Sequence, residues 1–212
     1  MKIVVITPHG SREEEINTVI KLFENGLETL HLRKPKYRTR EMKEYIEQIP
    51  VQFHNRIIIH SHHLLARKYS LKGIHFTKAH FKKTFRNWWI NTYLRFLKPD
   101  LLKTTSHTKL ASLYDDDSKK IKFDYVFLSP IFDSLTGKYQ SGFYEEGIRA
   151  TLGKVSKKII ARGGVDGTRI EKIKELGFYG MALYSHIWES KKPVEDFVEI
   201  LKRCRELSIA VD

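Results

Sequence analysis

Short apolar runs rich in β-branched residues alternate with helical patterns along the whole chain, and this alternation limits the possible folds more than any other feature. Eight runs have strand character, at residues 2–7, 29–33, 57–60, 73–76, 101–105, 125–128, 158–161 and 180–183. Strands separated by helical segments are typical of parallel βαβ units. An open doubly wound sheet is the alternative, but a closed barrel leaves no strand over. We therefore expect an α/β fold, a single (βα)8 TIM barrel that spans residues 1–212 as one domain.

The connections between the expected strands differ in clarity. Helical patterns are clearest after the first, second, seventh and eighth strands, and residues 11–14 and 168–171 each have the form of a capping box. Residues 81–97 are aromatic and basic without a clean apolar stripe, and residues 115–118 predict a solvated turn rather than a metal site.

Composition places the chain among globular proteins. A hydrophobic content of 41% over 212 residues is enough for a full core. No apolar run approaches the length of a bilayer span, and the first residues enter a strand without a signal peptide, so we expect a cytoplasmic protein with no membrane partner. Cys204 has no partner for an intrachain disulfide and is expected on the buried face of the last helix. The oligomeric state is not predicted.

The formal charge of +13 allows either a nucleic-acid partner or attraction of anionic substrates. The basic residues are dispersed along the chain, which favours a solvated basic surface and predicts no nucleic-acid partner. An RNA-binding protein would need exposed aromatics beside cations. The only candidates are Phe85, Trp88, Trp89 and Tyr93 beside Arg86 and Arg95. We expect these aromatics to pack over the side of the barrel.

In such a barrel the loops after the strands carry the chemistry. Gly163 and Gly164 follow the seventh strand, and Ser185 follows the eighth. Glycines allow backbone amides to approach an anion closely, and loops seven and eight are the usual phosphate site of these barrels. A tight turn is the alternative explanation of the glycine pair.

Two further strand ends carry polar side chains. His31 and Arg33 alternate along the second strand and share a face, and a guanidinium can bind a phosphate with two parallel hydrogen bonds. The loop after the sixth strand contains Ser134, Thr136 and Lys138, and its length suggests a lid over a polar ligand, with an ordinary surface loop as the alternative.

Histidines gather after the third and fourth strands, at positions 60, 62, 63, 75 and 80. Such a group suggests zinc or iron. No carboxylate or cysteine in these loops completes a typical ligand set, so we expect ligand contacts or capping and no metal. Thr105 and His107 lie at the fifth strand end, and His31, His60 and His107 are candidate acid/base groups because imidazole titrates near neutral pH.

These strand-end motifs, in this order, resemble the thiamine phosphate synthase/TenI family over nearly the whole chain. Residues 31–35, His-Leu-Arg-Lys-Pro, resemble Gln-Leu-Arg-Glu-Lys, and residues 105–108, Thr-Ser-His-Thr, resemble Ser-x-His-Thr. Residues 129–138 resemble Gly-Pro-Ile-Phe-x-Thr-x-Thr-Lys, and the segments at 162–165 and 180–185 complete the set.

The resemblance implies an enzyme of thiamine biosynthesis, a transferase that joins hydroxymethylpyrimidine diphosphate to thiazole phosphate. Gly163, Gly164 and Ser185 would hold the thiazole phosphate. Arg33 and Lys138 would hold the diphosphate, and His31 would replace a glutamine that contacts the pyrimidine. The remaining ligand-binding positions that the motifs imply are Lys34, Thr105, Ser134 and Thr136.

The chain departs from the synthase pattern at the magnesium ligands. The family's aspartates fall at Ser61 and at about His80 in this chain, so no metal ligand is predicted and synthase activity, with magnesium as its cofactor, is expected to be weak. Pro35 stands at the position of a basic lysine, which Lys34 or Lys36 could replace in part. The alternatives are a TenI-like thiazole tautomerase, although Pro130 stands where that enzyme has histidine, and a non-catalytic protein that binds a thiazole or thiamine phosphate.

Overall fold

The computed structural model describes residues 1–82, 84–114 and 121–212. In these residues, parallel strands follow one another in chain order around a closed barrel, which confirms the expected (βα)8 fold. The strands are β1 (Lys2–Ile6), β2 (Leu30–Leu32), β3 (Ile57–Ile59), β4 (Gly73–Phe76), β5 (Leu102–His107), β6 (Tyr125–Leu128), β7 (Ile159–Arg162) and β8 (Gly180–Leu183). Each lies within two residues of its expected bounds. The turn expected at 115–118 lies outside the described residues.

Helices lie between the strands and after β8. They are α1 (Glu15–Glu24), α2 (Thr39–Glu47), α3 (Leu65–Lys68), α4 (Lys78–Lys82), α5 (Thr84–Leu97), α6 (Glu145–Leu152), α7 (Ile170–Glu175), α8 (Ser185–Trp188) and α9 (Pro193–Glu206). Short 3-10 turns occur at Val51–Arg56, Leu110–Leu113 and Gly167–Arg169. Across the described ranges, none of the helices has the length and apolar character that crossing a bilayer requires.

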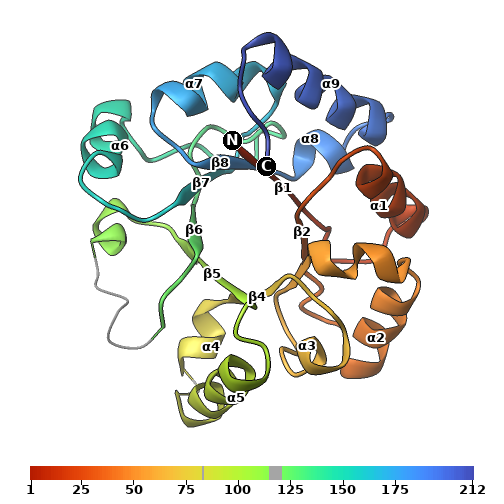
Figure 1. Ribbon diagram of the computed structural model, residues 1–212. Coiled ribbons are helices and arrows are strands. Elements are labelled where there is room, and N and C mark those ends of the chain that lie inside the picture. Colours follow the sequence, from red (N-terminus) through yellow and green to blue (C-terminus); the bar gives the residue numbers. More distant parts are fainter. Residues whose placement is uncertain (83, 115–120) are drawn as a thin grey trace. The chain divides into compact units, whose positions relative to one another are not determined.

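The chain divides into two compact units. The N-terminal unit is Ile6–Thr105, in which β2, β3, β4 and the first part of β5 pair in sequence. Leu30, Leu32 and Ile59 are fully buried in these strands. Both faces of a parallel sheet are covered, which explains why the strands read as apolar runs. Helices α2 and α3 lie on the outer side of β2 to β4 (Figure 1).

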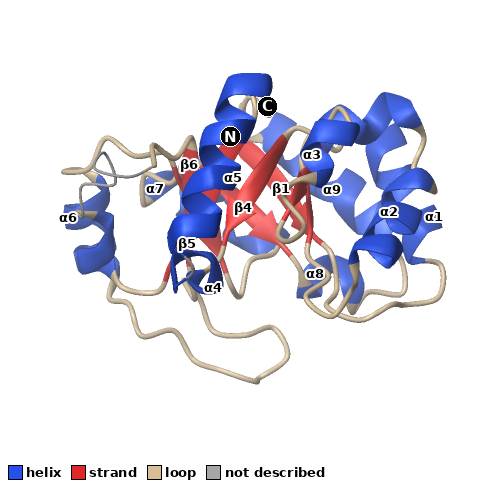
Figure 2. Cartoon of the chain, turned by 90° about the horizontal axis from the view of Figure 1, so that it is seen from below, coloured by secondary structure: helices blue, strands red, loops and turns tan. Residues whose placement is uncertain are grey.

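The C-terminal unit consists of Met1–Val5 and Ser106–Asp212. Strand β1 pairs with β8, β8 with β7, and β7 with β6, all in parallel. Figure 1 shows α6 and α7 outside β6, β7 and β8, and Figure 2 shows strands in red and helices in blue. Cys204 is fully buried on α9, as expected, and burial raises the pKa of its thiol. A thiol in that state is a packing group rather than a nucleophile.

Both expected capping boxes are wrong. Helix α1 begins at Glu15 rather than after Ser11, because the preceding Glu14 has a left-handed φ of 61°. The carboxylate of Glu15 turns inward and forms a buried ion pair with Lys34. Before α7, it is Asp166 whose side chain accepts a hydrogen bond from the Thr168 amide at 2.9 Å. This cap belongs to the 3-10 turn Gly167–Arg169 that leads into α7, and it lies two residues before the start of the expected box.

Most aromatics of residues 81–97 are exposed, contrary to the expected packing, and Tyr93 is half-buried. Helix α5 buries Leu94 completely, whereas Phe85, Trp88, Trp89 and Phe96 are 77, 62, 51 and 90% exposed. At 3.6 residues per turn these four side chains share the face opposite Leu94. The exposed face is therefore apolar, which is unusual for a surface helix. The side chains of Arg86 and Arg95 lie outside the described residues.

Candidate functional site

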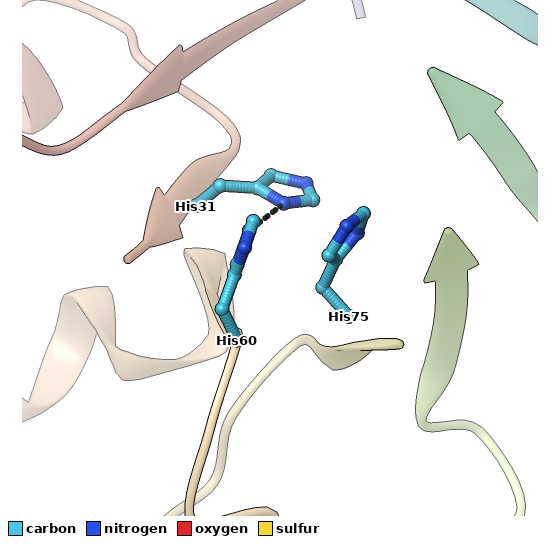
Figure 3. Close-up of side chains that lie close together, drawn as sticks. All are labelled: His31, His60 and His75. Atoms are coloured by element: carbon cyan, nitrogen blue, oxygen red, sulfur yellow. Dashed lines mark hydrogen bonds between the residues drawn. The ribbon is translucent and has the colours of Figure 1, made fainter. Parts of the chain in front are cut away.

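Three histidines of the N-terminal unit converge at neighbouring strands. Figure 3 shows the rings of His31 from β2, His60 directly after β3, and His75 from β4 pointing toward one another. One ring nitrogen of each lies within 4.8 Å of the others, and all three side chains are buried. His31 Nδ1 and His60 Nε2 form a hydrogen bond of 2.8 Å. The rings of His60 and His75 stack with centroids 4.0 Å apart.

The strand register brings these histidines together. His31 is paired with Ile58, and His60 lies two residues further along the same strand direction, so the two share one face of the sheet. Ile59 pairs with Ile74, and His60 and His75 are the residues that come next on these two neighbouring segments. The two histidines therefore lie beside each other on the same face of the sheet. His75 is paired in turn with Thr104 on β5, and the Thr104 hydroxyl lies 2.8 Å from His75 Nδ1.

The other histidines of this region bond to the backbone or to a threonine. His62 Nε2 lies 2.8 Å from the Tyr37 carbonyl oxygen, and His63 Nε2 lies 3.1 Å from that of His75. His80 Nδ1 accepts from the Thr77 amide at 3.0 Å. Burial first, and then the proximity of His80, lowers the pKa of His63 to about 3. These three therefore make contacts of the capping type within the protein, and the expected ligand contacts stay a prediction.

Lys34, one of the expected ligand-binding positions, has protein partners of its own. Lys34 is fully buried, and its ammonium donates to Glu15 Oε2 and to the Gly10 carbonyl, both at 2.7 Å. Tyr45 donates to the other oxygen of Glu15, also at 2.7 Å. Burial lowers the pKa of Lys34, while Glu15 opposes that shift. The neighbouring Arg33 is half-buried at the end of β2.

Two more candidate positions of the N-terminal unit have contrasting surroundings. The Thr105 hydroxyl donates to the Phe76 carbonyl at 2.9 Å and is buried. The hydroxyl oxygen of Ser61 is buried and has no hydrogen-bond partner among the described residues. A buried hydroxyl in that state is able to accept a polar ligand.

In the C-terminal unit, the two glycines pack against the loop after β6. Gly163 and Gly164 have φ values of +91° and +65°, which residues other than glycine rarely adopt. A Cβ at Gly164 would lie 2.1 Å from the Asp133 carbonyl oxygen. The Phe132 amide donates to the Gly163 carbonyl at 3.1 Å. The positive φ values and the close packing explain the two glycines by backbone geometry, and phosphate binding stays a prediction.

The same turn leaves donors for a ligand. Within the described ranges, the amides of Gly163 and Gly164 donate to no protein acceptor. Two backbone amides at a positive-φ turn form a concave site that suits an anion. Ser185, in the same unit, is half-buried at the start of α8.

The loop after β6 is held by its own hydrogen bonds. The hydroxyls of Ser134 and Thr136 are 3.0 Å apart, and the Ser141 amide donates to Asp133 Oδ1 at 2.7 Å. Lys138, in the same loop, is exposed. His107 is half-buried at the end of β5, and its carbonyl accepts from the Ser129 amide at 3.1 Å.

The expected site residues thus fall into two groups. His31 and His60 are in contact, and Arg33, Lys34 and Thr105 belong to the same N-terminal unit. The C-terminal unit contains His107, Ser134, Thr136, Lys138, Gly163, Gly164 and Ser185.

The sequence did not predict that His75 and Thr104 lie near His31. The sequence signal for this contact was a polar histidine, His75, inside the otherwise apolar strand run 73–76. In the structure its paired residue on β5 is Thr104, which is also polar.

The fold defines a class, the (βα)8 barrels, which carry their sites in the loops after the strands. Residues 3–187 match the model of the thiamine monophosphate synthase family, and the chain belongs to that family. A thiamine-phosphate synthase of Prochlorococcus marinus is 32% identical over 79 residues, 37% of this chain. The chain spans about a fifth of that relative's length, since the match covers 22% of it.

Two solved structures extend the likeness to the whole barrel. A thiamine phosphate pyrophosphorylase from Bacteroides thetaiotaomicron is 26% identical, with a TM-score of 0.74 and coverage of 97% of this chain and 98% of its own. A thiamine phosphate pyrophosphorylase from Pyrococcus furiosus is 18% identical, with a TM-score of 0.75 and coverage of 97% and 96%. At that identity the second structure supports the fold alone.

Proposed function

We propose that this chain binds a phosphorylated thiazole of thiamine biosynthesis through the turn at Gly163 and Gly164. The supporting observation is the pair of positive-φ amides that donate to no protein acceptor among the described residues. Family membership supplies the kind of ligand. Ser185 adds a hydroxyl from the same unit, and Lys138 supplies a cation for a second phosphorylated group.

Thermal unfolding with a panel of ligands tests this proposal, because a ligand that binds only the folded state raises the apparent stability. Thiazole phosphate should raise the unfolding temperature, and the unphosphorylated thiazole should not. Lys138→Gln should weaken binding of pyrimidine diphosphate and leave thiazole phosphate unaffected. Lys154→Gln, another exposed lysine of this unit, is the matched control. No shift with any phosphorylated thiazole would reject the proposal.

Magnesium-dependent synthase chemistry is expected to be weak in this chain. A diphosphate leaving group needs its charge offset, and magnesium prefers carboxylate and other hard oxygen ligands. Positions 61 and 80 carry a serine and a histidine, and the His80 ring is stacked on His63 with Nδ1 bonded to Thr77. These groups do not fit a magnesium ion.

Thiamine phosphate formation should therefore rise little with magnesium. The double variant Ser61→Asp/His80→Asp should increase the magnesium-dependent rate, with the exposed-site change Ser11→Asp as control. Robust wild-type turnover that a chelator abolishes and magnesium restores would show that other residues hold the ion.

Tautomerisation of a thiazole phosphate is the second candidate. The hydrogen bond between His31 and His60 favours it, because one imidazole can hold the other ready to accept or donate a proton. Exchange of a thiazole hydrogen with deuterated solvent measures this activity directly. Exchange should fall at least tenfold in His31→Gln if the pair acts. Equal exchange in the variant would leave binding alone as the function.

A further inference from the structure

Three buried imidazoles converge in the N-terminal unit, and the part of the chain that the structure describes adds no carboxylate to the group. We propose that His31, His60 and His75 form a site for one divalent transition-metal ion of the zinc type, with its fourth position open to water or a small ligand. This site differs from the sequence-based expectation, in which the histidines after the third and fourth strands were considered without His31.

The ligand types select the ion. Imidazole suits zinc, copper, nickel and iron, whereas magnesium and calcium require oxygen ligands. Three histidines with an open fourth position are one of the known ligand sets of catalytic zinc. The proposed ion is therefore distinct in kind from the magnesium that the synthase reaction uses.

The observed geometry is close to what coordination requires. Zinc–nitrogen bonds of about 2.0–2.1 Å at tetrahedral angles place two ligand nitrogens roughly 3.3 Å apart. His31 Nδ1 and His60 Nε2 are 2.8 Å apart, and the three candidate nitrogens lie within 4.8 Å. An opening of about half an ångström for the first pair, and an approach of at most about 1.5 Å by the His75 nitrogen, would complete the site.

Metal binding requires no loss of a proton from the imidazole rings. The bond between His31 Nδ1 and His60 Nε2 uses one N–H proton, and each neutral imidazole can carry its proton on either nitrogen. When the cation takes both lone pairs, that proton moves to the other nitrogen of its own ring, so each ligand stays neutral. Burial favours this neutral form, because several imidazolium charges in one buried volume would be costly.

Thr104 positions the third ligand. Its hydroxyl lies 2.8 Å from His75 Nδ1 and 3.5 Å from the Ile74 carbonyl oxygen. If its one proton goes to that carbonyl, the hydroxyl accepts from Nδ1–H, and the lone pair of His75 is then on Nε2. An outer partner that fixes the tautomer and orientation of a ligand histidine is typical of metal sites.

Titration of chelator-treated, tag-free protein with cobalt tests the site, because cobalt substitutes for zinc and gives visible absorption bands when four-coordinate. The absorption should saturate at one equivalent, and zinc should displace the cobalt. Zinc should also raise the unfolding temperature, whereas magnesium should not. Wild-type protein without a saturable site at one equivalent would overturn the proposal, whatever the variants do.

Variants assign the ion to these residues. His60→Asn and His75→Asn should each raise the dissociation constant for cobalt at least 100-fold, and Thr104→Val about tenfold. His62→Asn is the matched control, because His62 lies next to the group, outside it, and at a left-handed φ that asparagine tolerates. Circular dichroism verifies that each variant is folded. Equal loss in His62→Asn, or unchanged affinity in folded His60→Asn and His75→Asn, would place the ion elsewhere.

Because the metal site does not depend on the phosphate turn, the two proposals are separable. A thiazole phosphate shift without cobalt binding would reject only the metal site. Cobalt binding without any thiazole phosphate shift would reject only the proposed function.

Discussion

Lys34 shows how one charged residue can be explained by the structure rather than by a ligand. Its ammonium and the Glu15 carboxylate are 2.7 Å apart and both are buried. A buried ion pair contributes little net stability, but removing one partner leaves an uncompensated charge. Tyr45 adds a hydrogen bond to Glu15, and burial raises the pKa of that phenol well above its ordinary value.

Lys34→Met should therefore destabilise the fold by about 3–5 kcal/mol, because Glu15 is left buried without its cation. Urea unfolding followed by circular dichroism measures the change. Lys36→Met, at an exposed position two residues along, should stay within about 0.5 kcal/mol of wild type. Adding Glu15→Leu to Lys34→Met should restore part of the loss. A double variant less stable than Lys34→Met would contradict this account.

His63 should make stability fall in mild acid. Its pKa is lowered to about 3 in the folded chain, against 6.5 when unfolded, chiefly by burial. Between these values the unfolded chain binds a proton that the folded chain does not, so the free energy of unfolding decreases as pH falls from 6.5 toward 3. At 1.36 kcal/mol per pKa unit, the loss at about pH 4.5 is roughly 2–3 kcal/mol.

Urea midpoints at neutral pH and at about pH 4.5 measure this dependence. His63→Gln keeps a donor for the His75 carbonyl and removes the titrating ring, so its midpoint should change less over the same interval. The comparison between the two proteins cancels the carboxylates that they share. Identical pH dependence in both would mean that His63 is protonated in the folded chain.

At the scale of elements, the turn at Gly163 and Gly164 after β7 packs against the loop after β6. Gly164→Ala should cost at least about 1–2 kcal/mol, because alanine is strained at positive φ and its Cβ would collide with the Asp133 carbonyl. It should also weaken thiazole phosphate binding by displacing the neighbouring amides. Gly10→Ala is the control, since a Cβ there meets nothing within 4 Å. Denaturant unfolding gives the stability change, and calorimetry gives the affinity. Wild-type stability in Gly164→Ala would show that the turn is looser than its contacts imply.

Substitutions on the two faces of helix α5 should differ strongly in their effect on stability. Leu94 is fully buried, so Leu94→Ala should cost roughly 2–5 kcal/mol by losing transfer energy and leaving a cavity. Phe96, two residues along, is 90% exposed, and Phe96→Ser should stay within about 0.5 kcal/mol of wild type. Urea unfolding of both variants makes the comparison. A large loss in Phe96→Ser would mean that the aromatic face is covered, for example by another chain.

For the molecule as a whole, the sequence was sufficient for the architecture and insufficient for the site. Strand bounds could be read because each buried strand is a short apolar run between turn residues, as at 125–128 and 180–183. The convergence of His31, His60 and His75 could not be read, because it depends on which residues pair across three strands. The exposure of Trp88 could not be predicted either. Aromatic side chains in a helix predict burial, and only the packing of the helix decides which face is covered.

The high positive charge concerns the entire chain, and it leads to the last prediction. Many cations are locally offset by carboxylates: Lys172 pairs with Glu145, Arg203 with Glu171, and Lys68 with Glu47. The exposed aromatics of α5 are the feature that favours single-stranded nucleic acid, because bases stack on such rings. Yet Trp89 is already stacked on Tyr93, with ring centroids 5.1 Å apart, which occupies one face of each.

Binding to a single-stranded RNA of about 20 nucleotides should therefore be weak and purely electrostatic. Fluorescence anisotropy should give a dissociation constant above about 1 µM at roughly 150 mM salt, and the logarithm of the affinity should fall linearly with the logarithm of salt concentration. Trp88→Ala should change it little, because counterion release and not stacking supplies the energy. Submicromolar binding at that salt concentration, lost in Trp88→Ala and kept in the control Tyr144→Ala, would instead make the aromatic face of α5 a nucleic-acid site. Tyr144 suits the comparison because it is 85% exposed and lies in the other unit, so its loss removes an exposed ring without touching α5.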